Sequence, residues 1–508
     1  MVKPIVLIVL DGWGLAPPGP GNAVAQAKTP NMDKFWVGYP HTKLKACGKA
    51  SGLPEGEMGS SEFGHLIIGA GRIIYQDFSR ISLSISDGSF FKNKALVSAC
   101  HQAKSQGTSL HLLGLLSFGS IHADRNHLYA LLRLAKQQNL RPDQVKLHIF
   151  TDGRDSPPKS ALSLLVDLRT AMKEVGVGEI VTILGRYFMD RDRRWERTQK
   201  AYEALVQGIG ENASSPEEVI EKYYRNKITD EFVPPTIFTE SQVKEGDALI
   251  FFNFRADRVR QLTRAFIEPD FYGFKRKKVL KNLFFVSMTE FEKGLPVSAI
   301  AFPSRKINNA LPRVISERGL RQLHMAETEK YAFVTYYFNG LYEKPVIGED
   351  RILIPSPKVA TYDLKPEMSA YEITRVLLGK IKLKAYDFIL VNFANPDMVG
   401  HTGVLKAGIK ACEVVDECLG KVVRLVLAYN GVCIIVADHG NVEEMVDPKT
   451  GEVSTKHSLN PVPLIVIGKK WQGKPRTLLT GTLADVAPTI LKIMNIPKPI
   501  EMTGRSLI

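Results

Sequence analysis

Uninterrupted apolar runs of strand length recur along the chain, and several of them stop at an acidic residue or a histidine. Runs of valine, isoleucine and leucine without polar breaks are typical of strands buried on both faces, as in a parallel sheet covered by helices. The runs are PIVLIVL, YDFILVNF, VCIIVA and PVPLIVIG. The polar residues beside their ends are Asp11, Asp397, His401, Asp438, His439 and His457. The pattern therefore predicts an α/β protein with chemistry concentrated at strand ends.

In parallel sheets, ligand sites gather beyond the carboxyl ends of the strands. We therefore expect along one rim Asp11, Asp397, His401, Asp438 and His439. Each residue alone has an ordinary explanation, since an Asp after a strand often caps a turn. Mixed carboxylate and imidazole ligands suit zinc or manganese better than calcium, which prefers oxygen. Because the set is too large for one four-coordinate ion, it favours a two-metal site over unrelated turn and surface residues.

A serine pair stands between glycines at the head of a helix-like run, in EGEMGSSEFGHLIIGAGR at 55–72. Without the metal ligands, Ser60 and Ser61 would be an ordinary helix cap. A two-metal site handles phosphoryl groups well, and a serine becomes a strong nucleophile when a metal or base lowers its pKa. A helix N-terminus also presents backbone N–H groups to phosphate. Ser61 is therefore a candidate nucleophile.

Residues 76–305 separate one part of the expected ligand set from the rest, which predicts an inserted domain. Inside it, the strand-like runs SLHLLGLLS, VKLHIF, EIVTILG and DALIFFNF alternate with helical stretches, which indicates a second α/β unit. The expected hinges lie at 71–80 and 295–306. Arginine forks bind carboxylate and phosphate oxygens at two points, so arginines after these strands favour an anion cradle over scattered surface residues. The candidates are Arg154, Asp155, Arg186, Arg191, Arg255 and Arg258.

The length, net charge and cysteine content of the chain restrict the classes of function that it can have. A chain of 508 residues is expected to form two or more domains. The net charge of +14 is shared evenly between 76–305 and the remainder, and a small anionic substrate explains it at least as well as nucleic acid. The apolar runs are too short for a membrane span or a signal peptide. Five cysteines without CxxC spacing fit a reducing cytoplasm.

Nine motifs extend this interpretation along nearly the whole chain: LDGWG, EMGSSEFGHLIIGAGR, TDGRDSPP, GRYFMDRDRRWERTQKAY, FFNFRADRVRQ, AETEKYAFVTYYFNG, NFANPDMVGHTG, ADHGNVE and KHSLNPVP. In order and spacing they resemble the cofactor-independent phosphoglycerate mutases of the alkaline phosphatase superfamily. The resemblance implies a discontinuous metal-binding domain at 1–75 and 306–508, with a mostly parallel sheet covered by helices. It also implies that 76–305 is the substrate-binding, phosphotransferase domain.

The resemblance implies a role for each candidate residue. Ser61 would become a phosphoserine, Lys330 would neutralise the transferring phosphoryl group, and Asp155 would be the general acid or base. One metal ion would be held by Asp11, Ser61, Asp438 and His439, and the other by Asp397, His401 and His457. Manganese is the usual metal. Phosphoglycerate would be gripped by His122, Arg154, Asp155, Arg186, Arg191, Arg255, Arg258 and Lys330.

The implied reaction interconverts 3-phosphoglycerate and 2-phosphoglycerate in glycolysis and gluconeogenesis, without bisphosphoglycerate, in a cleft closed by the hinges. The resemblance further implies a cytoplasmic monomer with no nucleic-acid or membrane partner. Two other functions stay open: a phosphomonoesterase or other mutase on the same metal core, and a non-catalytic nucleic-acid-binding protein.

Two stretches depart from the family's pattern. Where members typically have SDGGVHSH, this chain has SFGSIHAD at 117–124, which keeps His122 but places Phe118 and Asp124 at positions usually held by Asp and His. Ser60 stands where members have Asn, and its hydroxyl has a shorter reach toward a phosphate. These changes leave the metal ligands intact and are expected to bear on substrate grip.

Overall fold

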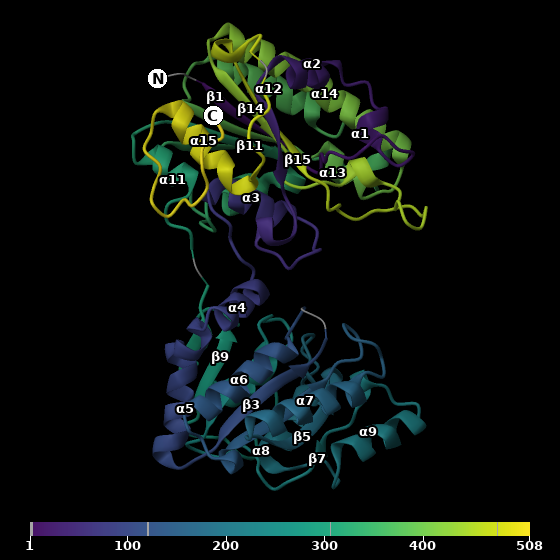
Figure 1. Cartoon of the computed structure of the whole chain (residues 1–508), viewed down its shortest axis with the longest axis vertical. Coiled ribbons are helices and arrows are strands. Elements are labelled where there is room, and N and C mark those ends of the chain that lie inside the picture. Colours follow the sequence, from purple (N-terminus) through teal and green to yellow (C-terminus); the bar gives the residue numbers. More distant parts are fainter. Residues whose placement is uncertain (1–3, 119–120, 305, 475) are drawn as a thin grey trace. The chain divides into compact units, whose positions relative to one another are not determined.

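The computed structural model describes residues 4–118, 121–304, 306–474 and 476–508. The chain divides into two compact units: unit 1 comprises Met1–Gln76 with Lys306–Ile508, and unit 2 comprises Asp77–Arg305. Figure 1 shows both. Gly119 and Ser120 of the SFGSIHAD segment, and Arg305 of the second expected hinge, lie outside the described residues.

Unit 1 is built on a mostly parallel sheet whose described strands follow the order β12-β11-β13-β1-β14-β15-β2-β16. Strand β1 lies in the middle, parallel to both β13 and β14, and all of its residues are buried. The strands are β1 (Ile5–Leu10), β2 (His41–Lys45), β11 (Gln322–Glu327), β12 (Glu349–Ile354), β13 (Phe388–Phe393), β14 (Val432–Val436), β15 (Val462–Gly468) and β16 (Gly481–Thr482).

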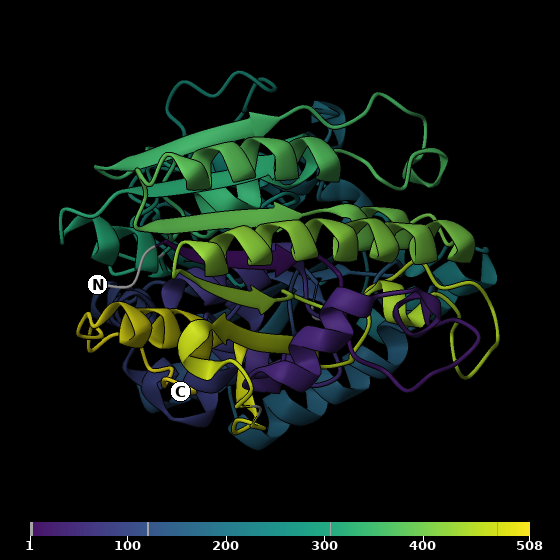
Figure 2. The same cartoon turned by 90° about the horizontal axis from the view of Figure 1, so that it is seen from above.

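Helices cover this sheet in two groups, which Figure 1 shows on opposite sides of the strands. The first group packs against the long helix α14 and the second against α3. Figure 2 shows α14, the long green helix, lying along the strands. The first group comprises α1 (Ala23–Gln26), α2 (Pro30–Gly38), α12 (Ala370–Lys382), α13 (Asn395–Gly400) and α14 (Leu405–Ala428). The second comprises α3 (Ser61–Ala70), α11 (Leu311–Ser316) and α15 (Val486–Met494).

Unit 2 holds a second, mostly parallel sheet of order β10-β9-β8-β3-β4-β5-β7-β6, in which β7 runs antiparallel to β5. Its strands are β3 (Leu110–Leu116), β4 (Val145–Thr151), β5 (Glu179–Gly185), β6 (Glu211–Asn212), β7 (Thr236–Ile237), β8 (Ala248–Phe251), β9 (Phe284–Thr289) and β10 (Ala299–Phe302). Its helices are α4 (Asp77–Ser86), α5 (Lys94–Gln106), α6 (Arg125–Gln137), α7 (Ala161–Val175), α8 (Trp195–Gln207), α9 (Pro216–Arg225) and α10 (Arg260–Ile267). The predicted α/β class with parallel sheets is confirmed.

One strand beside the candidate ligands is antiparallel to its neighbour in the mostly parallel sheet. Strand β15 runs antiparallel to β14, with Val436 paired to Leu464 and Val432 to Gly468. The start of β15 therefore lies beside the end of β14. This register brings His457, which precedes β15, to the rim occupied by Asp438, which follows β14.

Among the described helices, none combines the length and the apolar character that crossing a membrane requires. All five cysteines are free thiols, and Cys100, Cys412, Cys418 and Cys433 are buried. Burial raises the pKa of the Cys100 thiol to about 12, which keeps it protonated and unreactive.

Candidate metal centre and nucleophile

The first turn of α3 carries Ser61, because Ser60 caps the helix and its side chain accepts a hydrogen bond from the backbone N–H of Phe63 at 3.5 Å. Gly64 lets this turn approach the end of β14. A Cβ atom at position 64 would lie 2.7 Å from both Cβ and the backbone oxygen of Asp438. The glycine in the SSEFG motif therefore brings the serine and the strand-end carboxylate into one site.

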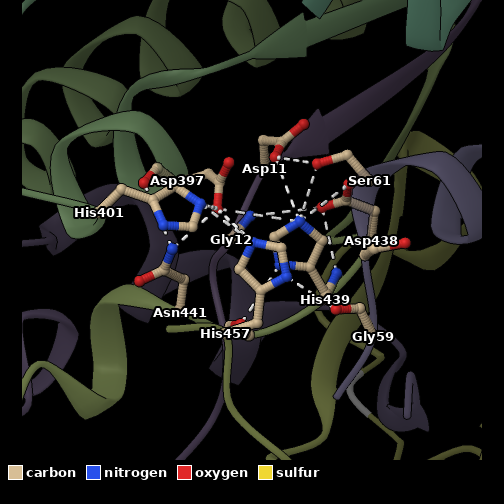
Figure 3. Close-up of polar contacts among 12 residues, drawn as sticks. Asp11, Gly12, Gly59, Ser61, Asp397, His401, Asp438, His439, Asn441 and His457 are labelled. Atoms are coloured by element: carbon tan, nitrogen blue, oxygen red, sulfur yellow. Dashed lines mark hydrogen bonds and ion pairs between the residues drawn. The ribbon is translucent and has the colours of Figure 1, made fainter. Parts of the chain in front are cut away.

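Three polar groups surround the hydroxyl of Ser61, which is buried with only 6% exposed (Figure 3). The hydroxyl lies 3.1 Å from Oδ1 of Asp11 and 2.9 Å from Nε2 of His439. Lys330 donates from Nζ to the same oxygen at 2.8 Å. An imidazole, a carboxylate and an ammonium group thus all meet the oxygen that would attack a phosphoryl group.

Asp397, His401 and His457 converge beside this hydroxyl, and their donor atoms fit a divalent cation. Nε2 of His401 and Nε2 of His457 lie 3.1 Å apart, and each is 3.2 Å from Oδ1 of Asp397. Nδ1 of each ring faces a backbone oxygen, that of Thr455 for His401 and that of Gly59 for His457. Because those oxygens only accept, the neutral form of each ring would carry its proton on Nδ1 and leave the Nε2 lone pair for a metal ion. A metal ion satisfies this arrangement.

The second predicted ligand group also comes together. Nε2 of His439 lies 3.5 Å from Oδ1 of Asp11 and 3.5 Å from Oδ2 of Asp438. His65 joins this group, with Nδ1 at 3.2 Å from Oδ2 of Asp438 and 2.9 Å from the backbone oxygen of Ser61. Asp11, His65 and Asp438 form one metal-competent cluster, and Asp11, Asp397 and His439 form another. The ligand-type side chains therefore surround Ser61 from two sides.

Charges within the site shift one another's protonation. Burial opposes protonation of Lys330, but Asp11 and Asp397, at 2.7 and 2.6 Å, raise its pKa above the ordinary lysine value. Burial likewise disfavours ionised Asp397, yet Lys330 and His439 hold its pKa well below the usual range. The pKa of His439 rises to about 10, because Asp438 and Asp397 outweigh the effect of burial. The site is thus a dense set of anions in which cations are strongly favoured.

Glu443 joins the loops that carry the candidate ligands. Its Oε2 accepts hydrogen bonds from the backbone N–H of Gly14 at 2.9 Å and of Asn441 at 2.8 Å. Its Oε1 accepts from the Ser458 hydroxyl and from Nδ2 of Asn460. These partners follow Asp11, His439 and His457, so one buried carboxylate fixes three loops at once.

Replacing Glu443 with glutamine is expected to weaken metal binding by about 10–100-fold, because an amide turns donors toward N–H groups that need acceptors. The measurement is metal affinity by calorimetry, with the melting temperature followed in parallel. Glu444→Gln is the matched control, since Glu444 accepts one side-chain hydrogen bond, from Asn460. Equal metal affinity in the two variants would contradict this role for Glu443.

In unit 2, most of the predicted anion-binding residues form a network of their own. Arg186 is buried and donates to Oδ2 of Asp155 at 2.7 Å and to Asp152. His122 lies 3.7 Å from the same Asp155 oxygen. Arg154 pairs with Glu231 at 3.5 Å with 57% of its side chain exposed, and its backbone N–H donates to Asp152 at 3.2 Å.

Asp257 links the remaining members of this network. Its carboxylate lies 3.2 Å from Nδ1 of His122, 2.8 Å from Arg191 and 3.6 Å from Arg255. Arg258 is buried and donates to the backbone oxygen of Met189 at 3.3 Å. Burial, together with the charges of Arg186 and Arg191, lowers the pKa of Arg258. This excess of cations around a buried arginine favours binding of an anion.

Sequence reasoning missed several residues of these networks, and some of them left a signal. His65 lies four positions after Ser61, which places the two on one face of a helix. Asn392 interrupts the apolar run of β13 and donates to Asp11 at 2.7 Å, and a buried polar residue in such a run marks a specific contact. Asp257 stands between two predicted arginines. Glu443 gave no distinguishing signal, since its role depends on loops that meet only in the fold.

Comparison with known proteins places this site in a class. The family model described as Metalloenzyme superfamily matches residues 3–498. The 2,3-bisphosphoglycerate-independent phosphoglycerate mutase of Clostridium perfringens is 53% identical over 100% of this chain and 99% of its own length. The enzyme of that name from Moorella thermoacetica is 52% identical over 100% of this chain and 98% of its own. A solved phosphoglycerate mutase of Leishmania mexicana, determined at low cobalt concentration, has a TM-score of 0.60 and 31% identity, covering 100% of this chain and 98% of that one.

The fold and site thus define a metalloenzyme of the α/β class that binds divalent metal. The chain belongs to the 2,3-bisphosphoglycerate-independent phosphoglycerate mutase family.

Proposed function

We propose that this chain interconverts 3-phosphoglycerate and 2-phosphoglycerate through a phosphoserine at Ser61, without bisphosphoglycerate. The observation that carries the proposal is the Ser61 hydroxyl, held between Asp11, His439 and Lys330 at the head of α3. The two ligand groups around it would hold two divalent ions, which we propose are both manganese. When bound, such ions lower the pKa of a nearby hydroxyl and stabilise negative charge on a transferring phosphoryl group.

The chain's own side chains perform the remaining steps. Lys330 offsets charge on the phosphoryl group as Ser61 attacks it, and the first turn of α3 offers backbone N–H groups to its oxygens. The arginines around Asp257 and Arg186 hold the glycerate carboxylate while the phosphoryl group is on the serine. Asp155 takes the proton from the glycerate hydroxyl that attacks phosphoserine and returns one to the hydroxyl that leaves.

Retention of glycerate separates a mutase from a phosphatase. If glycerate escaped, water would attack phosphoserine and the net reaction would be hydrolysis. The cationic network of unit 2 supports retention, since a phosphatase has no need to hold its dephosphorylated product. We further propose that 1–75 with 306–508 is the metal-binding phosphatase-like domain, that 76–305 is the substrate-binding domain, and that the chain acts as a cytoplasmic monomer.

The experiment is a phosphorus NMR assay of the purified chain with 3-phosphoglycerate and manganese, magnesium or cobalt. We expect 2-phosphoglycerate to form at the same rate with and without bisphosphoglycerate. We also expect turnover to stop on chelation and to return when metal is restored. Release of inorganic phosphate in place of 2-phosphoglycerate would establish a phosphatase and end the mutase proposal.

A further inference from the structure

Unit 1 contains a second charged site, a pocket of about 550 Å³ outside the metal centre. Its volume lies within the range of roughly 300–1,000 Å³ that small-molecule sites occupy. Residues at the start of β14 and the end of β15 line it, among them Val432 and Gly468. Asp438 follows the other end of β14, so the pocket and the metal centre lie at opposite ends of these strands.

Five cations line this pocket, and none of its lining side chains is acidic: Lys469, Lys470, Lys474, Arg476 and Lys492. Across the described parts of the chain, no ion pair involves any of the five. Most arginines of unit 2, by contrast, face a carboxylate, as Arg191 does with Asp257. Like charges gathered around one cavity repel one another, and a polyanion bound among them would relieve that repulsion.

The floor of the pocket is apolar. Val432, Ile493 and Ile508 line it together with the half-buried indole of Trp471. Nζ of Lys470 lies 5.6 Å from the centre of that ring, so the indole makes a cation–π contact with this lysine. Trp471 and Lys470 belong to one short 3-10 turn, Lys469–Trp471, at the end of β15. The pocket therefore combines a cationic rim with an apolar, aromatic base.

We propose that this pocket binds a polyphosphorylated small molecule, whose phosphates contact the lysines and Arg476. Ammonium and guanidinium groups bind phosphate oxygens by charge-assisted hydrogen bonds. The apolar base suits an organic ring attached to the phosphates, as in a nucleoside triphosphate. This site is separate from the proposed mutase reaction and does not depend on it.

The test is calorimetric titration of the metal-loaded chain with ATP and, separately, with tripolyphosphate. The double variant Lys470→Glu/Lys492→Glu is expected to bind the probe at least about tenfold more weakly than the unchanged chain. The control is Lys344→Glu/Lys365→Glu, which reverses two exposed lysines of unit 1 outside the pocket. Chelation of the metal by the probe and binding of the probe at the substrate site contribute equally to the heat measured for all three proteins. The difference in heat between the two double variants therefore reports binding in the pocket.

Tighter binding of ATP would identify nucleotides as the ligand class, and tighter binding of tripolyphosphate would identify inorganic polyphosphates. Either result supports the site if Lys470→Glu/Lys492→Glu weakens the binding. Equal binding by both double variants would overturn the proposal, and so would the absence of binding by either probe. Melting temperatures of the variants confirm that each chain is folded. Lys470 and Lys492 are exposed, so replacing them leaves the hydrophobic core unchanged, and a loss of binding would not come from unfolding.

Discussion

Replacing Ser61 with alanine is expected to lower turnover by at least about 10⁴-fold, because the variant has no oxygen to receive the phosphoryl group. Metal binding should largely survive, since Asp11, Asp438, His439 and the other imidazole and carboxylate groups remain. The measurements are the rate of 2-phosphoglycerate formation and metal content per chain. Mass spectrometry after acid quenching should find a phosphoryl group on the peptide carrying Ser61 in the unchanged chain and none in the variant.

The control is Ser316→Ala, which removes a hydroxyl of unit 1 that makes one hydrogen bond, to the backbone oxygen of Ile347 at 2.7 Å. It is expected to cost about 1 kcal/mol of stability and leave turnover within a factor of two. A Ser61→Ala chain with near-normal rate would show that another group carries the phosphoryl group.

The second large effect is expected for Asp397→Asn. Its carboxylate contacts Lys330 at 2.6 Å and lies 3.2 Å from both His401 and His457, so the change removes the charge that holds these groups together. We expect about one fewer metal ion per chain and a fall in turnover of at least about 10³-fold. Metal content by atomic spectroscopy and the mutase assay provide the two readouts.

Asp416→Asn is the matched control, because Asp416 is equally buried but its carboxylate caps the N-terminus of a helix. It accepts from the backbone N–H groups of Asn31 at 3.1 Å and Met32 at 2.7 Å, in the first turn of α2. That variant should lose stability and keep its metal. If Asp397→Asn retained the full metal content and turned over within tenfold of the unchanged chain, the two-metal arrangement proposed for this site would be wrong.

Strand ends made much of the metal centre visible in the sequence. Asp11 and Asp397 follow apolar runs that became neighbouring strands, and parallel pairing alone brings their ends together. His457 was harder to place, since it reaches the same rim only because β15 is antiparallel to β14. Direction of pairing depends on which strands meet in the fold, and an apolar run does not encode it.

Contacts of residues in turns, and contacts between neighbouring elements, were harder to predict from the sequence. Lys330 stands in a short 3-10 turn, and no pattern around it indicates that its ammonium reaches Ser61; only the resemblance named it. Arg154 was grouped with the other arginines by its position after a strand, and its charge helps to lower the pKa of Arg258, but that position did not indicate its ion pair with Glu231. Side-chain partners of long, flexible residues follow from tertiary packing, which sequence spacing does not fix.

The central position of β1 has a consequence for how the polypeptide is made. Its partners β13 and β14 lie at 388–393 and 432–436, so on the ribosome the strand IVLIVL emerges long before either neighbour exists. Unit 2 is a single stretch of chain, so all of it is translated during that interval. Until β13 and β14 have been translated, this wholly apolar segment has no partner strand in the sheet, and an unpaired apolar strand is prone to aggregation.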